Sequence, residues 1–369
     1  MNAGGPRRPA SGQEVDPTRI IQLDPHGLRQ DAANDCTLVG ASLGPSSTAS
    51  FQGLFTAHYA EIRRICEAHP QQGLVMIACG PGDAFAWAFL RARAETAAVA
   101  ILGRHGGVDL YLPHDPSLSL RHLVVLLHPA APGEEPSFRL LDMRTPTAFL
   151  DEHGNRLEAL LAEGPVFVRC AGWAIFFLPT GDGLPWPESP ADGWECIPER
   201  IYQEEQPAEP DRWQRRRPLG RQLLLAADAS PPRPGARNDA RTAVQILQGP
   251  ALAGPELLAP GEAPLGRLDI ETAEASAILT VGASALHRGI LLGRYERCDS
   301  PGVPILIDSR ISRVHLLLVE IAGVPYAVDM ASTNGLWLDD ALQRLVPLQP
   351  GRPLGLGRDL ATLRWRPVG

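Results

Sequence analysis

The chain has 369 residues, enough for two ordinary domains that each bury a hydrophobic core. Its formal net charge of −8 excludes a general attraction for nucleic acid or anionic membrane, so any anion site must be local. Gly and Pro contribute 36 residues each, which favours turns and short strands over long helices. The basic residues are all arginine, whose planar guanidinium suits phosphate and carboxylate.

The N-terminal region predicts an arm followed by a helix. Residues 1–19 are polar and rich in Gly and Pro, which predicts a disordered arm. In the segment 20–72, apolar residues from Phe51 to Ile65 recur at helical spacing behind Ser50, which indicates one amphipathic helix with a serine N-cap. No stretch approaches the roughly 20 apolar residues of a membrane span, and the start lacks the apolar core of a signal peptide. We therefore expect a cytoplasmic protein without membrane insertion.

Two β-rich regions follow along the chain. Residues 73–180 contain short apolar runs split by turn residues, which predicts a β-sandwich. Residues 181–274 are rich in proline and arginine, a composition that argues against a compact core and predicts a linker. Short strands return over residues 275–369. The expected fold class is mainly β: two β-sandwiches joined by a Pro/Arg-rich linker, with a short N-terminal helical segment.

The two β-rich regions resemble each other, which indicates a tandem repeat. Downstream of the shared motifs, residues 149–179 align without a gap to residues 337–367. The aligned motif pairs are Gly103 with Gly293, Arg104 with Arg294, Ser119 with Ser312, and His122 with His315.

Three short motifs occur in order in the second copy: Gly-Arg at 293–294, Ser-x-x-His at 312–315 and Thr-Asn-Gly at 333–335. Each motif alone is weak, but the ordered set, at spacings that leave room for strands, is specific. Residues 275–369 thereby resemble a forkhead-associated (FHA) domain. The resemblance implies an eleven-stranded β-sandwich that binds phosphothreonine peptides on loops at one end, and it implies no catalysis.

The candidate phosphopeptide site consists of Arg294, Ser312, Arg313, Thr333 and Asn334. A phosphothreonine carries about −1.5 to −2 charges and three acceptor oxygens, so its receptor needs a fixed cation and neutral donors. Arg294 supplies the cation, Ser312 donates its hydroxyl, and Arg313 adds charge. Thr333 and Asn334 lie on a turn-forming loop, and the resemblance implies that Asn334 binds the peptide backbone.

Three further motif residues are expected to be structural: Gly293, His315 and Gly335. The resemblance places His315 behind the phosphate loop, and Asn-Gly favours a turn with positive φ. Taken singly, each residue has an ordinary interpretation: an arginine at a strand end is usually solvated, and a serine often caps a turn. The binding hypothesis depends on the ordered set.

The first copy departs from this pattern and is interpreted as a degenerate FHA-like sandwich. Residues 144–149 read RTPTAF, one residue shorter than the second-copy loop and without Asn-Gly. Arg104, Ser119 and Thr147 form a candidate second, weaker anion site, to which Arg121 and Arg144 supply charge. The alternative is a domain kept for packing or for a phosphate-independent partner.

The leading hypothesis is a phosphothreonine-dependent adaptor in bacterial Ser/Thr kinase signalling. Its partners are a phosphothreonine-containing protein and a Ser/Thr protein kinase or its substrate, with no nucleic acid. The alternative is a phosphate-independent structural scaffold for a cytoplasmic or secretion-associated assembly. An enzyme is not expected, because the sequence lacks Gly-x-Ser-x-Gly, a Walker loop, His-Glu-x-x-His and a complete Gly-x-Gly-x-x-Gly. We expect neither a cofactor nor a metal site.

Overall fold

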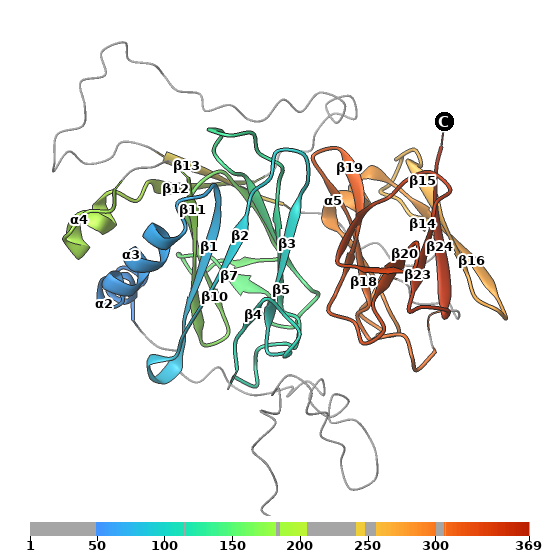
Figure 1. Cartoon of the computed structure of the whole chain (residues 1–369), viewed down its shortest axis with the longest axis horizontal. Helices are drawn as coiled ribbons and strands as arrows, with labels where there is room; N and C mark the ends of the chain where they lie inside the picture. The colour runs from blue at the N-terminus through green and yellow to red at the C-terminus, as the bar shows by residue number, and fades with distance from the viewer. Residues whose placement is uncertain are drawn as a thin grey trace, which may run out of the picture.

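Two β-sandwiches lie side by side in the computed structural model, with short helices on the outer face of the first (Figure 1). The structure describes residues 49–113, 115–181, 185–204, 241–247, 256–299, 306 and 308–368. The arm expected at residues 1–19 lies outside these ranges. Within them, no helix is both long enough and apolar enough to cross a membrane.

The N-terminal helical segment is two short helices rather than the single helix expected. Helix α2 spans Phe51–Ala57 and helix α3 spans Tyr59–Ala68, with His58 between them. The Ser50 side chain caps α2 by accepting the backbone N–H of Gly53 at 3.0 Å, as the sequence predicts. The apolar faces of both helices pack on the outer face of the first sandwich through a buried cluster that includes Phe55, Ile62, Val75, Phe167 and Phe176.

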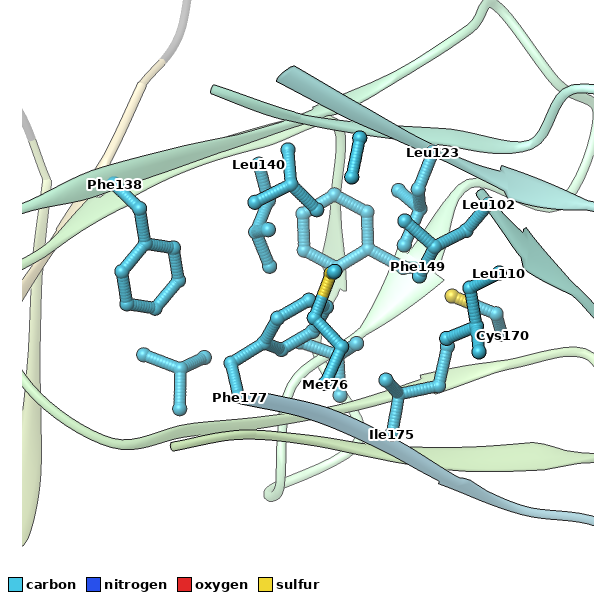
Figure 2. Packing of buried hydrophobic residues seen from close by; sticks show 14 of the residues in the cluster. Met76, Leu102, Leu110, Leu123, Phe138, Leu140, Phe149, Cys170, Ile175 and Phe177 are labelled. Atoms are coloured by element: carbon cyan, nitrogen blue, oxygen red, sulfur yellow. The ribbon is translucent and has the colours of Figure 1, made fainter. Parts of the chain in front are cut away.

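The first sandwich pairs a six-stranded sheet with a seven-stranded sheet in the described residues. The six-stranded sheet has the order β2-β1-β11-β10-β7-β8. Its strands are β1 Gly73–Cys79, β2 Phe85–Arg91, β7 Phe149–Leu150, β8 Arg156–Leu157, β10 Val166–Cys170 and β11 Trp173–Thr180. The 3₁₀ turn η2 at Pro81–Asp83 lies between β1 and β2. The seven-stranded sheet has the order β12-β13-β9-β6-β5-β3-β4 and comprises β3 Ala98–Gly103, β4 Leu110–Tyr111, β5 Leu123–Leu127, β6 Phe138–Asp142, β9 Ala159–Ala162, β12 Glu199–Glu204 and β13 Arg241–Ile246. Figure 2 shows Met76, Leu102, Phe149 and Phe177 filling the space between the two sheets.

The stretch 181–274, expected to be a linker, contributes ordered elements to both sandwiches. Helix α4 (Pro190–Glu195) lies near α2 and α3, and β13 extends the first sandwich by pairing Val244 with Ala162. Burial alternates along β13, because one of its faces is the core and the other is solvent. Composition alone does not reveal such short, half-buried strands, because proline and charged residues surround them.

The second sandwich pairs a seven-stranded with a four-stranded sheet in the described residues, matching the eleven strands expected. The larger sheet has the order β14-β16-β15-β24-β23-β20-β21, with β14 Glu256–Leu257, β15 Gly266–Glu271, β16 Ser276–Val281, β20 Leu336–Leu338, β21 Ala341–Gln343, β23 Pro353–Leu356 and β24 Ala361–Pro367. The smaller has the order β17-β18-β19-β22, with β17 Ile290–Leu292, β18 Leu316–Ile321, β19 Val324–Asp329 and β22 Leu345–Pro347; helix α5 spans Ala283–Arg288. Because β15 pairs with β24 along its whole length, this sandwich begins before the boundary at 275 drawn from the sequence.

The two sandwiches share a buried apolar interface. The sheet that carries β3 and β5 faces the sheet that carries β18 and β19 (Figure 1). Equivalent residues of the two copies lie on its two sides. A dimer with two-fold symmetry is similar, because each subunit contributes the same patch. The equivalent buried pairs are Ile101 and Leu291, Val124 and Leu317, Leu126 and Val319, and Met143 and Met330.

Polar contacts also cross this interface. Arg139 is buried, with 1% of its surface exposed. Its Nη1 donates to the backbone oxygen of His287 at 2.7 Å, and its Nη2 lies 3.6 Å from the Glu320 carboxylate. A charge this deeply buried requires such partners, so the interface has a defined register as well as apolar contact.

Candidate functional site

The three motifs of the second sandwich meet at one end because its strands are antiparallel. Arg294 follows the end of β17, and Ser312 precedes the start of β18. The Thr333–Gly335 loop connects the end of β19 to the start of β20. Strand β18 pairs antiparallel with both β17 and β19, so these ends lie at the same edge of the sheet.

Arg294 is exposed at this edge, and the neighbouring loop orients its guanidinium. Its Nε donates to the carbonyl oxygen of Ile311 at 2.9 Å. Its backbone N–H donates to the carbonyl oxygen of Ser312 at 3.3 Å. Among the described residues the structure gives Arg294 no carboxylate partner, so its charge is available to an anion. Gly293 permits this approach: a Cβ there would lie 2.1 Å from the Arg313 carbonyl oxygen.

His315 is fully buried and joins two of the loops. Its Nδ1 accepts the backbone N–H of Ser312 at 3.1 Å, which assigns the proton to Nε2. Nε2 lies 3.2 Å from the carbonyl oxygen of Gly335 and 3.1 Å from Ser332 Oγ. Burial lowers the pKa of His315, which keeps the ring neutral. His315 thus links the two loops from inside the sandwich.

Ser312 and the Thr333–Gly335 loop are tied directly to each other. Ser312 Oγ accepts the backbone N–H of Thr333 at 3.0 Å, which leaves its own hydroxyl proton to donate elsewhere. Asn334 Nδ2 donates to the carbonyl oxygen of Arg310 at 2.7 Å. Gly335 has φ 72°, in the left-handed region expected for an Asn-Gly turn. The loop is therefore held in one conformation with Thr333 exposed.

The structure brings Arg294, Ser312, Thr333 and Asn334 together at one edge. Arg313, the remaining predicted ligand residue, lies beside Ser312 and is half-buried. Its carbonyl oxygen accepts the backbone N–H of Tyr295 at 3.1 Å, so its main chain is part of the loop scaffold.

Ser332 is a further residue that holds the loop, and the sequence motifs do not single it out. Its Oγ donates to Asp329 Oδ1 at 2.5 Å and accepts the backbone N–H of Gly335 at 2.9 Å. The sequence signal for this role is a serine three residues before a glycine in a turn. Short hydroxyl side chains commonly bond to nearby backbone groups.

The first copy builds the same edge with the same framework. Ser119 donates its backbone N–H to His122 Nδ1 at 3.1 Å, and Arg104 Nε donates to the Leu118 carbonyl oxygen at 2.6 Å. His122 Nε2 lies 2.8 Å from the carbonyl oxygen of Ala148. Burial lowers the pKa of His122 to about 4, so this ring is neutral as well.

The loop of the first copy is not shorter, contrary to the alignment drawn from the sequence. Thr145 makes the bonds that Ser332 makes: its Oγ1 donates to Asp142 at 2.5 Å and accepts the backbone N–H of Ala148 at 3.0 Å. Ala148, with φ 52°, thus occupies the position of Gly335. The extra residue of the second copy therefore lies after this loop.

The loop residues that face solvent in the second copy are replaced in the first. Pro146 stands where Thr333 stands and has no N–H to donate to Ser119. Thr147 stands where Asn334 stands, but its hydroxyl is buried, without a hydrogen-bond partner in the described part of the chain. Thr147 therefore does not replace the Asn334 amide in the candidate second site.

The two arginines expected to supply charge to the first copy cross to the second sandwich instead. Arg121 donates to the carbonyl oxygens of Met330 and Ala331. Arg144 Nη2 donates to the carbonyl oxygen of Gly289 at 2.9 Å and lies 3.2 Å from Asp299.

The chain is similar to one protein family and to several solved structures. The family model of the FHA domain matches residues 290–357. FHA-1 of Mycobacterium tuberculosis Rv1747 is 23% identical over 28% of this chain and 99% of its own, with a TM-score of 0.22. The Slr1951 protein from Synechocystis sp. is 19% identical over 29% and 99%, with a TM-score of 0.25.

A comparison with curated proteins gives no match. The family match covers the motif loops, and the three motifs meet at one end of a β-sandwich, as the resemblance implies. The C-terminal sandwich of this chain is therefore an FHA domain.

Proposed function

We propose that the chain is a phosphothreonine-dependent protein–protein interaction adaptor in bacterial Ser/Thr kinase signalling, acting in the cytoplasm. The FHA domain binds the peptide, and its partners are a phosphothreonine-containing protein and a kinase or that kinase's substrate. The observation that carries the proposal is the exposed Arg294 beside Ser312, whose hydroxyl is fixed by the backbone N–H of Thr333.

The chemistry of this edge suits a phosphate monoester. The Arg294 fork holds two phosphate oxygens, and each hydrogen bond to a charged group contributes about 1.5 to 3 kcal/mol. Ser312 has a hydroxyl proton to donate to a third oxygen, and Arg313 adds charge beside it. Asn334 Nδ2 donates to the backbone oxygen of Arg310, and its second amide hydrogen and its Oδ1 are the groups that bond to the peptide backbone in this proposal.

The role is binding rather than catalysis. The His315 imidazole is buried, and both its nitrogens are engaged within the loop scaffold, so it cannot transfer protons at the surface. The site offers fixed donors and a cation, which recognise a phosphate without activating a nucleophile.

A second candidate function is a phosphate-independent scaffold for a cytoplasmic or secretion-associated assembly. The observation that favours it is the first sandwich, which keeps the fold but has Pro146 and a buried Thr147 hydroxyl in the loop. In that case the second sandwich would serve the same structural purpose, and phosphate would not affect its partner.

Titration of the full chain with matched peptides separates the two functions. A peptide chosen from a degenerate phosphothreonine library is titrated beside the same peptide without phosphate. We expect binding of the phosphorylated form alone, because the modified side chain is the anchor of a loop-bound extended peptide. Equal binding of both forms, or binding of neither, would contradict the adaptor proposal. The full chain is used because a fragment that begins at residue 275 lacks β15 and exposes the interface between the sandwiches.

A further inference from the structure

We propose that Arg121, in the first sandwich, is a positioning residue for the phosphopeptide loop of the second sandwich. Arg121 lies on the loop before β5, between Ser119 and His122. The inference rests on the proposed function and assigns the first sandwich a part in it: the first sandwich supports the binding loop rather than reading a phosphate itself.

The contact joins one guanidinium to two successive carbonyl groups. Arg121 Nε donates to the carbonyl oxygen of Met330, and Nη2 donates to that of Ala331 at 2.5 Å. Both carbonyls come directly before Ser332, the residue that precedes the Thr333–Gly335 loop. Two donors in a rigid planar fork fix the orientation of two consecutive peptide groups, which one donor cannot do.

The backbone at this point is in an unfavourable conformation. Ala331 has φ 51°, a left-handed conformation that residues with a Cβ rarely adopt. Ala331 is therefore held in a turn that its own side chain does not favour. Because Arg121 bonds to the carbonyl of Ala331 itself, it stabilises that turn from the other sandwich.

The turn leads directly to the candidate ligand residues. The next residue, Ser332, bonds to Asp329 and to the backbone N–H of Gly335. The residue after it, Thr333, donates its N–H to Ser312. A rotation at Ala331 would change the position of this hydrogen-bonded loop relative to Arg294.

The repeat provides a matched control. Arg144 occupies the position of Ala331 in the first copy and also crosses the interface, but to Gly289 and Asp299 rather than to the binding loop. The second copy has Val314 at the position of Arg121, so the loop support runs in one direction only. Loss of Arg144 loosens the interface and leaves the contacts to Met330 and Ala331 in place.

The test uses the full chain with Arg121→Met, which keeps an unbranched apolar stem and removes both donors. The probe is the tightest-binding peptide from a degenerate phosphothreonine library. We expect the Kd to rise about tenfold, since two charge-assisted hydrogen bonds to the loop are lost. We also expect faster amide hydrogen exchange at Thr333 and Gly335, because their N–H bonds depend on the position of the loop. Arg121→Lys, with a single ammonium, should be intermediate in both measurements, and Arg144→Met should match wild type in both.

Wild-type affinity and wild-type exchange in Arg121→Met would overturn the inference. Equal losses in Arg121→Met and Arg144→Met would also overturn it, because they would show a general loosening of the interface. If Arg121→Met unfolds, Arg121→Lys decides: intermediate values support positioning and wild-type values contradict it. A wild-type protein that binds no phosphopeptide would overturn the proposed function instead, and exchange at Thr333 and Gly335 would still decide the role of Arg121.

Discussion

The two sandwiches build their loop ends with the same hydrogen bonds but present different side chains to solvent. In both, a serine backbone N–H donates to a buried histidine Nδ1 at 3.1 Å. In both, a hydroxyl two residues after a buried methionine bonds to an aspartate and to a later backbone N–H. The second copy then presents Thr333 and Asn334, whereas the first has Pro146 and Thr147.

The difference separates the loop scaffold from ligand recognition. Buried histidine and hydroxyl groups hold the loop, and their removal would leave unsatisfied polar groups inside either sandwich. The solvent-facing positions carry no such penalty, so they decide what each copy can bind. Four predictions test this division, and they are given from the largest expected effect to the smallest.

Arg294→Ala should weaken phosphopeptide binding by about 100-fold, because two or more hydrogen bonds to a dianion are lost. The fold should be intact, since Arg294 is exposed and, within the described residues, its side chain bonds only to the Ile311 carbonyl oxygen. Fluorescence anisotropy measures the affinity, and a thermal melt measures the stability.

Arg104→Ala is the matched control in the first copy. It should leave phosphopeptide affinity unchanged, because the first copy has Thr147 rather than an amide at the position of Asn334. A loss equal to that of Arg294→Ala would show that both copies bind and that the comparison of their loops is mistaken.

Thr333→Pro copies the first-copy loop into the second. It should weaken phosphopeptide binding by about tenfold, because proline removes the N–H that fixes the Ser312 hydroxyl at 3.0 Å. Pro146 shows that the loop backbone accepts proline at this position. Isothermal titration measures the affinity, and Thr333→Ala, which keeps the N–H, is the control. If the two variants bind equally, the N–H of Thr333 has no part in the site.

Phosphothreonine should be preferred over phosphoserine in otherwise identical peptides. Burial of one γ-methyl contributes about 0.8 kcal/mol, which is roughly fourfold in affinity. We expect a larger ratio, because a methyl group also restricts the phosphate-bearing rotamer. Competition between the two peptides for wild-type protein gives the ratio directly. Equal affinities would mean that the site reads the phosphate alone.

Gly335→Ala should cost about 1 kcal/mol of stability, the penalty for a left-handed residue with a Cβ. Leu342, whose Cδ1 would lie 2.1 Å from the new Cβ, is 63% exposed and has room to move. Ala148 at φ 52° shows that an alanine is tolerated at this turn in the first copy. Chemical denaturation measures the change. A cost several times larger would show that Leu342 is more tightly held than its exposure indicates.

The sequence by itself determined the β-sandwich class and the ordered motifs of the second copy, and its internal similarity predicts a tandem repeat. These depend on local spacing: apolar runs set the strands, and Gly-Arg, Ser-x-x-His and Thr-Asn-Gly lie at strand ends that antiparallel pairing brings together. The family resemblance predicts structural roles for Gly293 and His315. The structure adds the close backbone approach at Gly293 and the burial of His315.

Only the tertiary structure decided where the linker strands and the crossing arginines belong. β13 and β15 are short and lie among proline-rich residues, and their partners Ala162 and Trp365 are distant in sequence. Arg121 and Arg144 are charged residues in loops, which by composition belong to solvent. Their bonds to the other sandwich form because the apolar faces of two sheets pack together and bring backbone carbonyl groups within reach. That packing depends on the match between two folded surfaces, which no local pattern in the chain records.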